Sequence, residues 1–402
     1  MFITGDYVGM NDRFRVSHKS LLLASLLCVV LVSSLFVCLF VNVTSGAFLE
    51  NAVHVKNETE LKDAINNAPD GKSTTIALDN DITLTSYDEQ NHIYNYRVAT
   101  LIIPANKDIT LTSNKANGFY KLIGAVHQVD TILVGNDGVL RLDGIIVTHK
   151  KGATDSGVHV LTKLQGKNSG ILYLYSGEIS GNTVNNSLYG GGVVNAGTFI
   201  MTGGKITGNS AESCGGGVYN SGIFEMSGGE ISGNTAGGGG GVCNGYYAQF
   251  TMSGGVISGN TARGGGGVHS GYYSQFTMSG GKISSNTASV DGGGVYTVMY
   301  SEFIMLGGEI SGNSAEEGGG VYIYDATFDR RGGVISGNTA MRGDNDVFHS
   351  GDNNGPTDGN NGSVVDGFSL GYIVITCVIT AAVTICITLV VLHLSSKKRL
   401  NQ

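Results

Sequence analysis

Apolar residues recur through the middle of the chain with a period of about 26 residues. The segment at residues 250–262, Phe-Thr-Met-Ser-Gly-Gly-Val-Ile-Ser-Gly-Asn-Thr-Ala, returns with small changes in several further copies. A fixed period of this length indicates one structural unit stacked on copies of itself, not a globular domain with a single centre. Most of the conspicuous residues are therefore expected to serve the stacking.

The copies align on five columns of residues. An asparagine follows each isoleucine by three residues, and a phenylalanine or leucine precedes it by seven. A methionine, leucine or arginine stands two residues after that phenylalanine or leucine. A valine block completes each copy. The columns are Ile179, Ile206, Ile231, Ile257, Ile283, Ile310, Ile335; Asn182, Asn209, Asn234, Asn260, Asn286, Asn313, Asn338; Leu172, Phe199, Phe224, Phe250, Phe276, Phe303, Phe328; Leu174, Met201, Met226, Met252, Met278, Met305, Arg330; and Val193, Val218, Val242, Val268, Val295, Val321, Val347.

The spacing of these columns separates strands from loops. The stretch from the aromatic residue to the asparagine keeps one length in every copy, whereas the stretches on either side of the valine vary by a few residues. Fixed length is typical of paired strands whose register cannot slip, and variable length is typical of loops. The aromatic and methionine side chains stand two residues apart, so they point to one face of a strand. The two glycines that follow let the chain turn a corner.

We predict an all-β fold, a right-handed parallel β-helix solenoid with three short strands in each rung of about 26 residues. Ladders of Ile, Val, Phe and Met fill its interior. An asparagine ladder follows one corner, where the left-handed conformation suits asparagine and its amide can bond to the next rung. A leucine-rich repeat is excluded because no leucine framework is present, and collagen because the glycines lack a period of three.

Residues 50–170 look like an irregular start of the solenoid whose regular repeats occupy 171–348. Apolar spacing from Glu60 to Ala68 predicts a short amphipathic helix with Thr59 as its N-cap. This helix would cover the exposed edge of the first rung. Short strands are expected at Ile76–Leu78, Ile82–Leu84, Leu101–Ile103, Ile109–Leu111, Leu122–Ile123, Ile132–Val134, Leu140–Leu142 and Ile145–Val147.

Both ends of the chain carry long apolar stretches. Leu21–Val41 follows basic residues and precedes small ones, so residues 1–47 are either a cleaved signal peptide or an uncleaved signal anchor, and we expect cleavage. Ile373–Leu394 predicts a transmembrane helix at 372–394. The alternative, a buried core helix, fits poorly because a β-helix has no place for one.

The charges beside these stretches predict the topology. Lys397, Lys398 and Arg399 favour a cytoplasmic tail at 395–402. Residues 349–371, rich in Gly, Asn and Asp, are then a flexible stalk. The solenoid is expected outside the cell, held in the cell membrane by one span after signal cleavage or by two spans without it.

The charge of the predicted exterior is acidic. Residues 1–19 carry a net charge of +1 and residues 395–402 carry +3; removing both from the total of −8 leaves −12 for the rest. An acidic surface argues against nucleic acid or anionic lipid as the partner of the repeats.

The repeats resemble the adhesin-like parallel β-helix proteins of bacterial and archaeal cell surfaces, and are more distantly similar to the chlamydial polymorphic outer-membrane protein repeats. The resemblance covers roughly residues 60–348 and rests on a recurrent Gly-Gly-Val and on Ile-Ser/Thr-Gly-Asn in six of seven copies, with Ser285 at the third position of the other. The chlamydial Gly-Gly-Ala-Ile and Phe-x-x-Asn motifs are absent as regular elements, and the residues after 348 leave no room for a membrane barrel. The resemblance implies an adhesive surface role and names no ligand.

Catalysis on the same fold is the main alternative, because many polysaccharide lyases and hydrolases use it with acidic residues on neighbouring rungs. The residue before each isoleucine alternates in charge, which favours a surface ladder of opposite charges over a pair of catalytic acids. Neither a catalytic residue nor a cofactor is expected, and a passive cell-envelope component is the third interpretation. The residues considered are Glu178, Lys205, Glu230, Val256, Lys282, Glu309 and Val334; the non-equivalent Asp155, Asp291 and Asp325; and the scattered His149, His159, His269 and His349.

The cysteines do not suggest a disulfide framework or a metal site. Four of the six, Cys28, Cys38, Cys377 and Cys386, lie in the apolar stretches. Cys214 stands four residues before its valine and Cys243 one residue after its own, so they are not equivalent positions.

Two features are candidate binding sites. Tyr247, Tyr273 and Tyr300 each precede their phenylalanine by three residues and should stack in one column, with Tyr246 and Tyr272 beside it. Exposed aromatic columns suit glycan rings or surface proteins of another cell, and packing against the solenoid wall is the alternative. The second feature, Arg342-Gly343-Asp344, is a tripeptide that can bind integrins on a loop but arises readily by chance.

Overall fold

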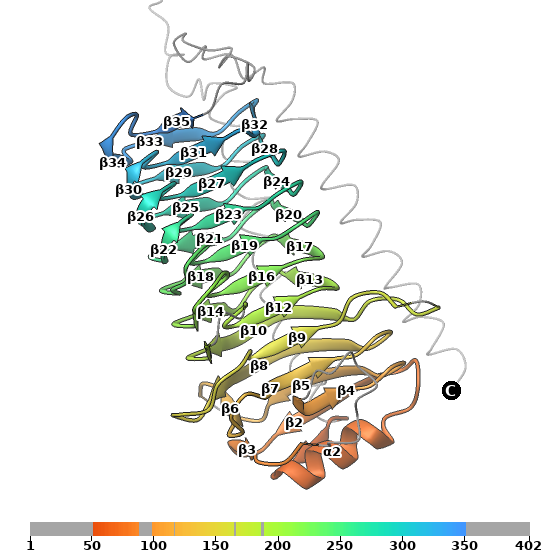
Figure 1. The fold of residues 1–402 in the computed structure, drawn as a ribbon. Coiled ribbons are helices and arrows are strands. Elements are labelled where there is room, and N and C mark those ends of the chain that lie inside the picture. The colour runs from red at the N-terminus through yellow and green to blue at the C-terminus, as the bar shows by residue number, and fades with distance from the viewer. Residues whose placement is uncertain (1–50, 88–98, 116, 165, 186–188, 351–402) are drawn as a thin grey trace, which may run out of the picture. The chain divides into compact units, whose positions relative to one another are not determined.

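A computed structural model describes residues 51–87, 99–115, 117–164, 166–185 and 189–350. They form a parallel β-solenoid of the right-handed kind, and Figure 1 shows its strands stacked from helix α2 at the N-terminal end to β35 at the other. The predicted all-β parallel solenoid is confirmed.

The two predicted membrane segments and most of the predicted stalk lie outside the described residues. Within the described part of the chain, no helix is long and apolar enough to cross a bilayer.

The irregular first rungs contain the strands that the sequence predicts, most of them longer at one or both ends. The predicted strands at 140–142 and 145–147 are joined in one strand, because Gly144 takes a φ of 85° and bends the chain without ending its pairing. The elements are β1 Val53–Val55, α2 Glu58–Asn67, β2 Ser73–Leu78, β3 Ile82–Leu84, β4 Ala99–Ile103, β5 Asp108–Ser113, β6 Tyr120–Gly124, β7 Asp130–Val134, β8 Val139–His149 and β9 Val158–Val160.

Helix α2 begins two residues earlier than predicted. Its N-cap is Asn57, not Thr59, and the Asn57 side-chain oxygen accepts a hydrogen bond from the Glu60 backbone N–H at 3.0 Å. Glu60 in turn accepts from the Lys56 backbone N–H at 2.7 Å, which resembles a capping box. Leu61 and Ile65 are buried in the core of the first rungs.

The regular rungs contain a fourth strand that the sequence analysis assigned to a loop. The valine, phenylalanine and isoleucine strands are as predicted, and in most rungs a short Thr-Ala or Ser-Ala strand follows the asparagine, with its alanine buried. The first long strand is β10 Ile171–Ser180. The valine strands are β12 Val193–Asn195, β16 Val218–Asn220, β19 Val242–Asn244, β23 Val268–Ser270, β27 Val295–Val298, β31 Val321–Tyr324 and β35 Val347–Ser350.

The remaining strands complete each rung. The phenylalanine strands are β13 Thr198–Met201, β17 Ile223–Met226, β20 Gln249–Met252, β24 Gln275–Met278, β28 Glu302–Met305 and β32 Thr327–Arg330. The isoleucine strands are β14 Lys205–Thr207, β18 Glu230–Ser232, β21 Val256–Ser258, β25 Lys282–Ser284, β29 Glu309–Ser311 and β33 Val334–Ser336. The fourth strands are β11 Thr183–Val184, β15 Ser210–Ala211, β22 Thr261–Gly264, β26 Thr287–Asp291, β30 Ser314–Glu317 and β34 Thr339–Arg342.

The interior is built from columns of like residues. Phe276 is fully buried, and its ring stacks on those of Phe250 and Phe303 at centroid distances of 4.8 and 4.7 Å, each 7° from parallel. Met278 and Ile283 are buried in the same rung. The predicted core is confirmed. The phenylalanine strands of neighbouring rungs pair without a register shift.

The buried asparagines form the predicted corner ladder. The Asn234 side-chain oxygen accepts from the previous rung, while its backbone N–H and side-chain NH₂ both donate to the Asn260 oxygen, at 3.0 and 2.9 Å. The left-handed residue is the one before each asparagine, such as Gly233 with φ 63°, so the predicted conformation was assigned to the wrong position. Asn338 ends the ladder by donating to the Asp346 carboxylate at 2.9 Å.

A second buried asparagine ladder was missed. Asn195 donates to Asn220 at 2.7 Å, and Asn220 donates to Asn244 at 2.8 Å. The signal was a Val-x-Asn pattern in three successive valine strands. In the next rung Ser270 takes this position, where its hydroxyl pairs with Ser274 at 2.8 Å.

We expect Asn260→Ala to lower the free energy of unfolding by roughly 1–3 kcal/mol, because buried donors of Asn234 lose their acceptor. Hydrogen exchange should accelerate in the two neighbouring rungs and stay unchanged in distant ones, since rung energies are nearly nearest-neighbour. Thr261→Ala, at the exposed residue next in sequence, is the matched control. Equal exchange in both variants would contradict a structural role for the ladder.

Candidate functional site: a column of exposed tyrosines

The tyrosine column stands on an insertion that three successive rungs share. Six residues lead from Val218 to Phe224, but eight lead from Val242 to Phe250. The longer corner recurs in the next two rungs, and its tip carries the residue pairs Tyr246-Tyr247, Tyr272-Tyr273 and Met299-Tyr300.

The tip of each corner is a tight turn with an unusual third residue. The Ala248 backbone N–H donates to the Gly245 carbonyl at 3.2 Å, which closes a four-residue turn around the two tyrosines. Tyr247 and Tyr273 both have φ 55°, and Tyr300 has φ 60°. That position normally takes glycine or asparagine, because a bulky side chain is strained there.

The rings form the predicted column and remain exposed. Tyr247 stacks on Tyr273, and Tyr273 on Tyr300, with centroids 5.2 Å apart in both pairs. Tyr246 stacks on Tyr272 at 5.3 Å beside them. The exposed fractions are 70% for Tyr247, 46% for Tyr273 and 62% for Tyr300, so the rings do not pack against the solenoid wall.

Stacking decides which parts of the rings a ligand can reach. The faces of Tyr273 are covered by Tyr247 and Tyr300, whereas each outer ring keeps one face that no tyrosine of the column covers. The column therefore presents ring edges and hydroxyls in a row, repeated about every 5.2 Å, with one ring face at each end. Gln249, Gln275 and Glu302 follow the three tyrosines by two residues, and add amide and carboxylate groups beside the row.

A second, largely covered column lies on the outer face of the valine strands. Its residues directly follow the valines, and the glycine loops fold over them: a Cβ on Gly264 would meet the Tyr296 ring at 3.0 Å. Burial, with the nearby Asp291 carboxylate, raises the pKa of Tyr296 to about 12. This column was not predicted from the sequence; its members are Tyr219, Cys243, His269, Tyr296, Tyr322 and Phe348.

Cys214 and Cys243 form a disulfide, although the cysteine spacing in the sequence did not suggest one. Their positions are not equivalent along a rung. The loop carrying Cys214 folds over the valine strands, and this brings its sulfur to the outward position after the valine of the next rung.

Two histidines that look scattered in the sequence approach one carboxylate. Asp130 lies 3.2 Å from the His159 ring nitrogen Nδ1, and its charge also acts on His149. Asp130 and His159 are buried, and so are both ring nitrogens of His149. A substrate cannot reach these groups in the structure described.

The charged column before the isoleucines is a surface ladder, as predicted. Lys205 pairs with Glu230 at 3.3 Å, and Lys282 pairs with Glu309 at 2.8 Å. Both pairs are substantially exposed and join neighbouring strands. They do not form a pair of catalytic acids.

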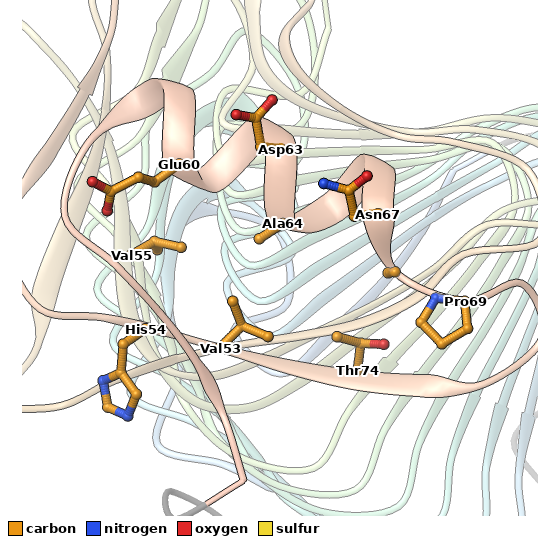
Figure 2. Close-up of a pocket in the computed structure, with 10 residues that line it drawn as sticks. Val53, His54, Val55, Glu60, Asp63, Ala64, Asn67, Pro69 and Thr74 are labelled. Atoms are coloured by element: carbon orange, nitrogen blue, oxygen red, sulfur yellow. The ribbon is translucent and has the colours of Figure 1, made fainter.

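A pocket of about 410 Å³ lies between helix α2 and the first strands (Figure 2). Val55 and Ala64 face the gap, and His54 is bonded to Asp79 at 2.8 Å. The Glu60 carboxylate accepts hydrogen bonds from the Lys56 backbone N–H and the Asn57 side-chain NH₂ at the start of the helix. The histidine of this pocket and one of its two carboxylates are therefore already engaged in hydrogen bonds.

The Arg342-Gly343-Asp344 tripeptide begins at the last residue of β34, the fourth strand of the last rung. The Arg342 guanidinium pairs with Glu316 at 2.9 Å, and Gly343, with φ 69°, lies over the Phe348 ring. The arginine of the tripeptide is thus engaged within the solenoid.

No family model, no curated protein and no solved structure matches the chain. The resemblance to adhesin-like solenoids stays a prediction.

The His149 environment predicts a loss of stability in acid. Burial opposes the charged ring and lowers the pKa of His149 to about 4, while the unfolded value is near 6.5. The neutral ring therefore contributes stability that is present above about pH 6.5 and is lost as the pH falls through 4. Urea unfolding from pH 7.5 to 4 should show a shallower loss for His149→Gln than for the parent.

His349→Gln, at an exposed histidine of the last strand, is the matched control and should follow the parent. If His149→Gln follows the parent as well, burial of a neutral His149 does not govern acid stability.

Proposed function

We propose that the chain is a membrane-anchored surface protein whose extracellular β-solenoid makes contact with glycans or proteins of another cell. The tyrosine column is the proposed contact surface. The observation that carries this proposal is that three successive rungs hold an exposed tyrosine in a strained left-handed conformation.

Strain at these tips supports a role beyond folding. A non-glycine residue in the left-handed region costs of order 1–3 kcal/mol, and persists where the surrounding structure imposes it. Glycine, which the chain uses at most of its other left-handed positions, would remove that cost. Tyrosine at these positions accepts the strain and provides an exposed aromatic surface that glycine lacks.

The chemistry of the column suits contact. Tyrosine offers a large, amphipathic surface with little conformational entropy to lose, and the turns hold the five rings in two rows. The row of hydroxyls with flanking Gln249, Gln275 and Glu302 suits a ligand with repeated hydroxyl or amide groups, such as a polysaccharide or an extended peptide.

Contact is favoured over catalysis because the row of tyrosines is exposed, whereas three of the acidic groups that could serve catalysis are buried or already paired. The Asp130–His159 pair brings an acid and a base together, and it is buried. Glu230 and Glu309, the exposed carboxylates of two rungs on the isoleucine face, are paired with lysines. A carbohydrate-active enzyme of this fold remains the alternative.

An extracellular position is supported by independent features. Disulfides such as Cys214–Cys243 persist mainly in oxidising compartments. The apolar stretches at 21–41 and 373–394 supply the proposed targeting segment and anchor. In this proposal helix α2 protects the first rung from edge-to-edge association.

Replacing Tyr247, Tyr273 and Tyr300 together by asparagine should weaken attachment by about 1–3 kcal/mol, a value typical of lost aromatic contacts. Asparagine tolerates the left-handed conformation, so thermal unfolding should change little. Binding of the purified chain to immobilised polysaccharides and to fixed cells provides the measurement.

The matched control is the triple phenylalanine variant, which keeps the rings and removes the hydroxyls. Weak binding by both variants assigns the contact to the hydroxyls, and weak binding by the asparagine variant alone assigns it to the rings. Parental binding by the asparagine variant would remove the column from the proposal.

The topology is tested separately on intact cells. Protease should remove epitopes placed in the solenoid and spare a tag placed after Gln402, because the basic residues at 397–399 favour a cytoplasmic tail. Permeabilised cells, in which both should be cleaved, are the control. Loss of the C-terminal tag from unbroken cells would reverse the proposed orientation.

A further inference from the structure

The Cys214–Cys243 disulfide has a third potential ligand group beside it. Cys243 and His269 occupy equivalent positions on β19 and β23 and are paired in register. Cys214 lies in the loop before β16, where its backbone pairs with that of Gly238 in the next loop as an isolated parallel β-bridge. The disulfide thus joins a loop to a strand one rung farther along, and His269 follows on the rung after that.

Three atoms that can bind a metal lie close together. The Cys214 sulfur lies 3.9 Å from His269 Nδ1. Both sulfurs and a ring nitrogen of His269 lie within 4.8 Å of one another. The described residues contain no other cluster of three or more His, Cys, Asp or Glu side chains with this geometry.

A glycine keeps the space between these atoms open. Gly238 is the counterpart of Cys214 in the next loop, and a Cβ placed there would lie 2.8 Å from His269 Nδ1 and 3.2 Å from the Cys214 sulfur. The His269 ring is fixed from the other side, because it stacks on Tyr296 at 5.0 Å. Its second nitrogen, Nε2, is buried without a hydrogen-bond partner among the described residues.

We propose that reduction of this disulfide converts the cluster into a binding site for a zinc-class cation, with Cys214, Cys243 and His269 as ligands. The two states exclude each other, since the sulfurs are either bonded together or available to the metal. This inference concerns the valine face and does not depend on the tyrosine column.

The chemistry of the switch balances with an external dithiol. The dithiol supplies two electrons and two protons and becomes a disulfide, while the Cys214–Cys243 bond breaks to give two thiols. A divalent cation then binds the two thiolates, and two protons are released to solvent. Burial lowers the pKa of His269 to about 4, so its ring is neutral at neutral pH and has a lone pair to offer.

The observed distance of 3.9 Å between the Cys214 sulfur and His269 Nδ1 is close to the one that a zinc site requires. Zn–S bonds of about 2.3 Å and Zn–N bonds of about 2.0–2.1 Å in a tetrahedron place two sulfurs roughly 3.8 Å apart and a sulfur and a nitrogen roughly 3.5 Å apart. The Cα atoms of the two cysteines are 5.8 Å apart, so side-chain rotation can separate the sulfurs. A fourth ligand can come from the adjoining pocket of about 260 Å³, which His269, Arg263 and Asp291 line.

Cobalt binding to the full chain tests the proposal. Cys28, Cys38, Cys377 and Cys386 are replaced by serine in all samples, so that the two solenoid cysteines are the sole thiols. A phosphine reductant, which leaves no competing thiol, prepares the reduced chain. We expect one Co²⁺ per reduced chain, with thiolate-to-cobalt charge-transfer absorption that Zn²⁺ abolishes, and no such absorption for the oxidised chain.

The decisive variant is His269→Phe, which keeps the disulfide and a ring against Tyr296 but removes the nitrogen ligand. Its metal affinity should fall by more than the ~10–100-fold that loss of an outer partner causes. His349→Phe is the matched control and should bind like the parent. Disulfide formation and circular dichroism check the fold of each variant, and Cys243→Ser, without the disulfide, should bind weakly under both redox conditions.

Three results would overturn the proposal. They are absence of cobalt binding by the reduced chain, equal binding by the oxidised and reduced chains, and parental affinity in His269→Phe. The last would leave a two-thiol site in which histidine has no part.

Discussion

The structure depends on one constraint: each residue of a rung lies against its equivalent in the next rung, at the spacing of hydrogen-bonded parallel strands. A side chain therefore has to be compatible with a copy of itself. Phenylalanine meets this condition by stacking its ring, and asparagine by offering an oxygen to one neighbour and NH₂ to the other. Charged residues meet it by alternating in sign, as Lys282 and Glu309 do.

This constraint explains what could be predicted from the sequence. The constant distance from Phe250 to Asn260 predicted the paired strands and their register, because any slip would break every column at once. The short fourth strand was missed, because its Thr-Ala or Ser-Ala signal, although it directly follows the asparagine, opens a stretch of variable length that is typical of a loop. The Cys214–Cys243 bond was also missed, because alignment of the repeats compares equivalent positions and cannot show how a loop folds over the next rung.

The tyrosine column is the place where local preference and structure disagree. Its register was predictable from the constant spacing of Tyr247, Tyr273 and Tyr300 before their phenylalanines. Its left-handed backbone was not, because the sequence places a bulky residue where glycine is preferred. The two outward faces also differ in accessibility, as glycine loops cover the ring of Tyr296 and nothing of the kind covers Tyr247.

The corner asparagine ladder has a direction. Each asparagine from Asn182 to Asn313 donates to the next asparagine toward the C-terminal end, and the Asp346 carboxylate accepts from Asn338 at the last position. A rung inserted or removed within the ladder leaves the pattern of donors and acceptors intact, so recombination between repeats can lengthen or shorten the solenoid without a new structural solution. The terminal acceptor is needed only once. The number of rungs, and with it the reach of the solenoid, is therefore a quantity that gene duplication can change while the chemistry of the two ends is kept.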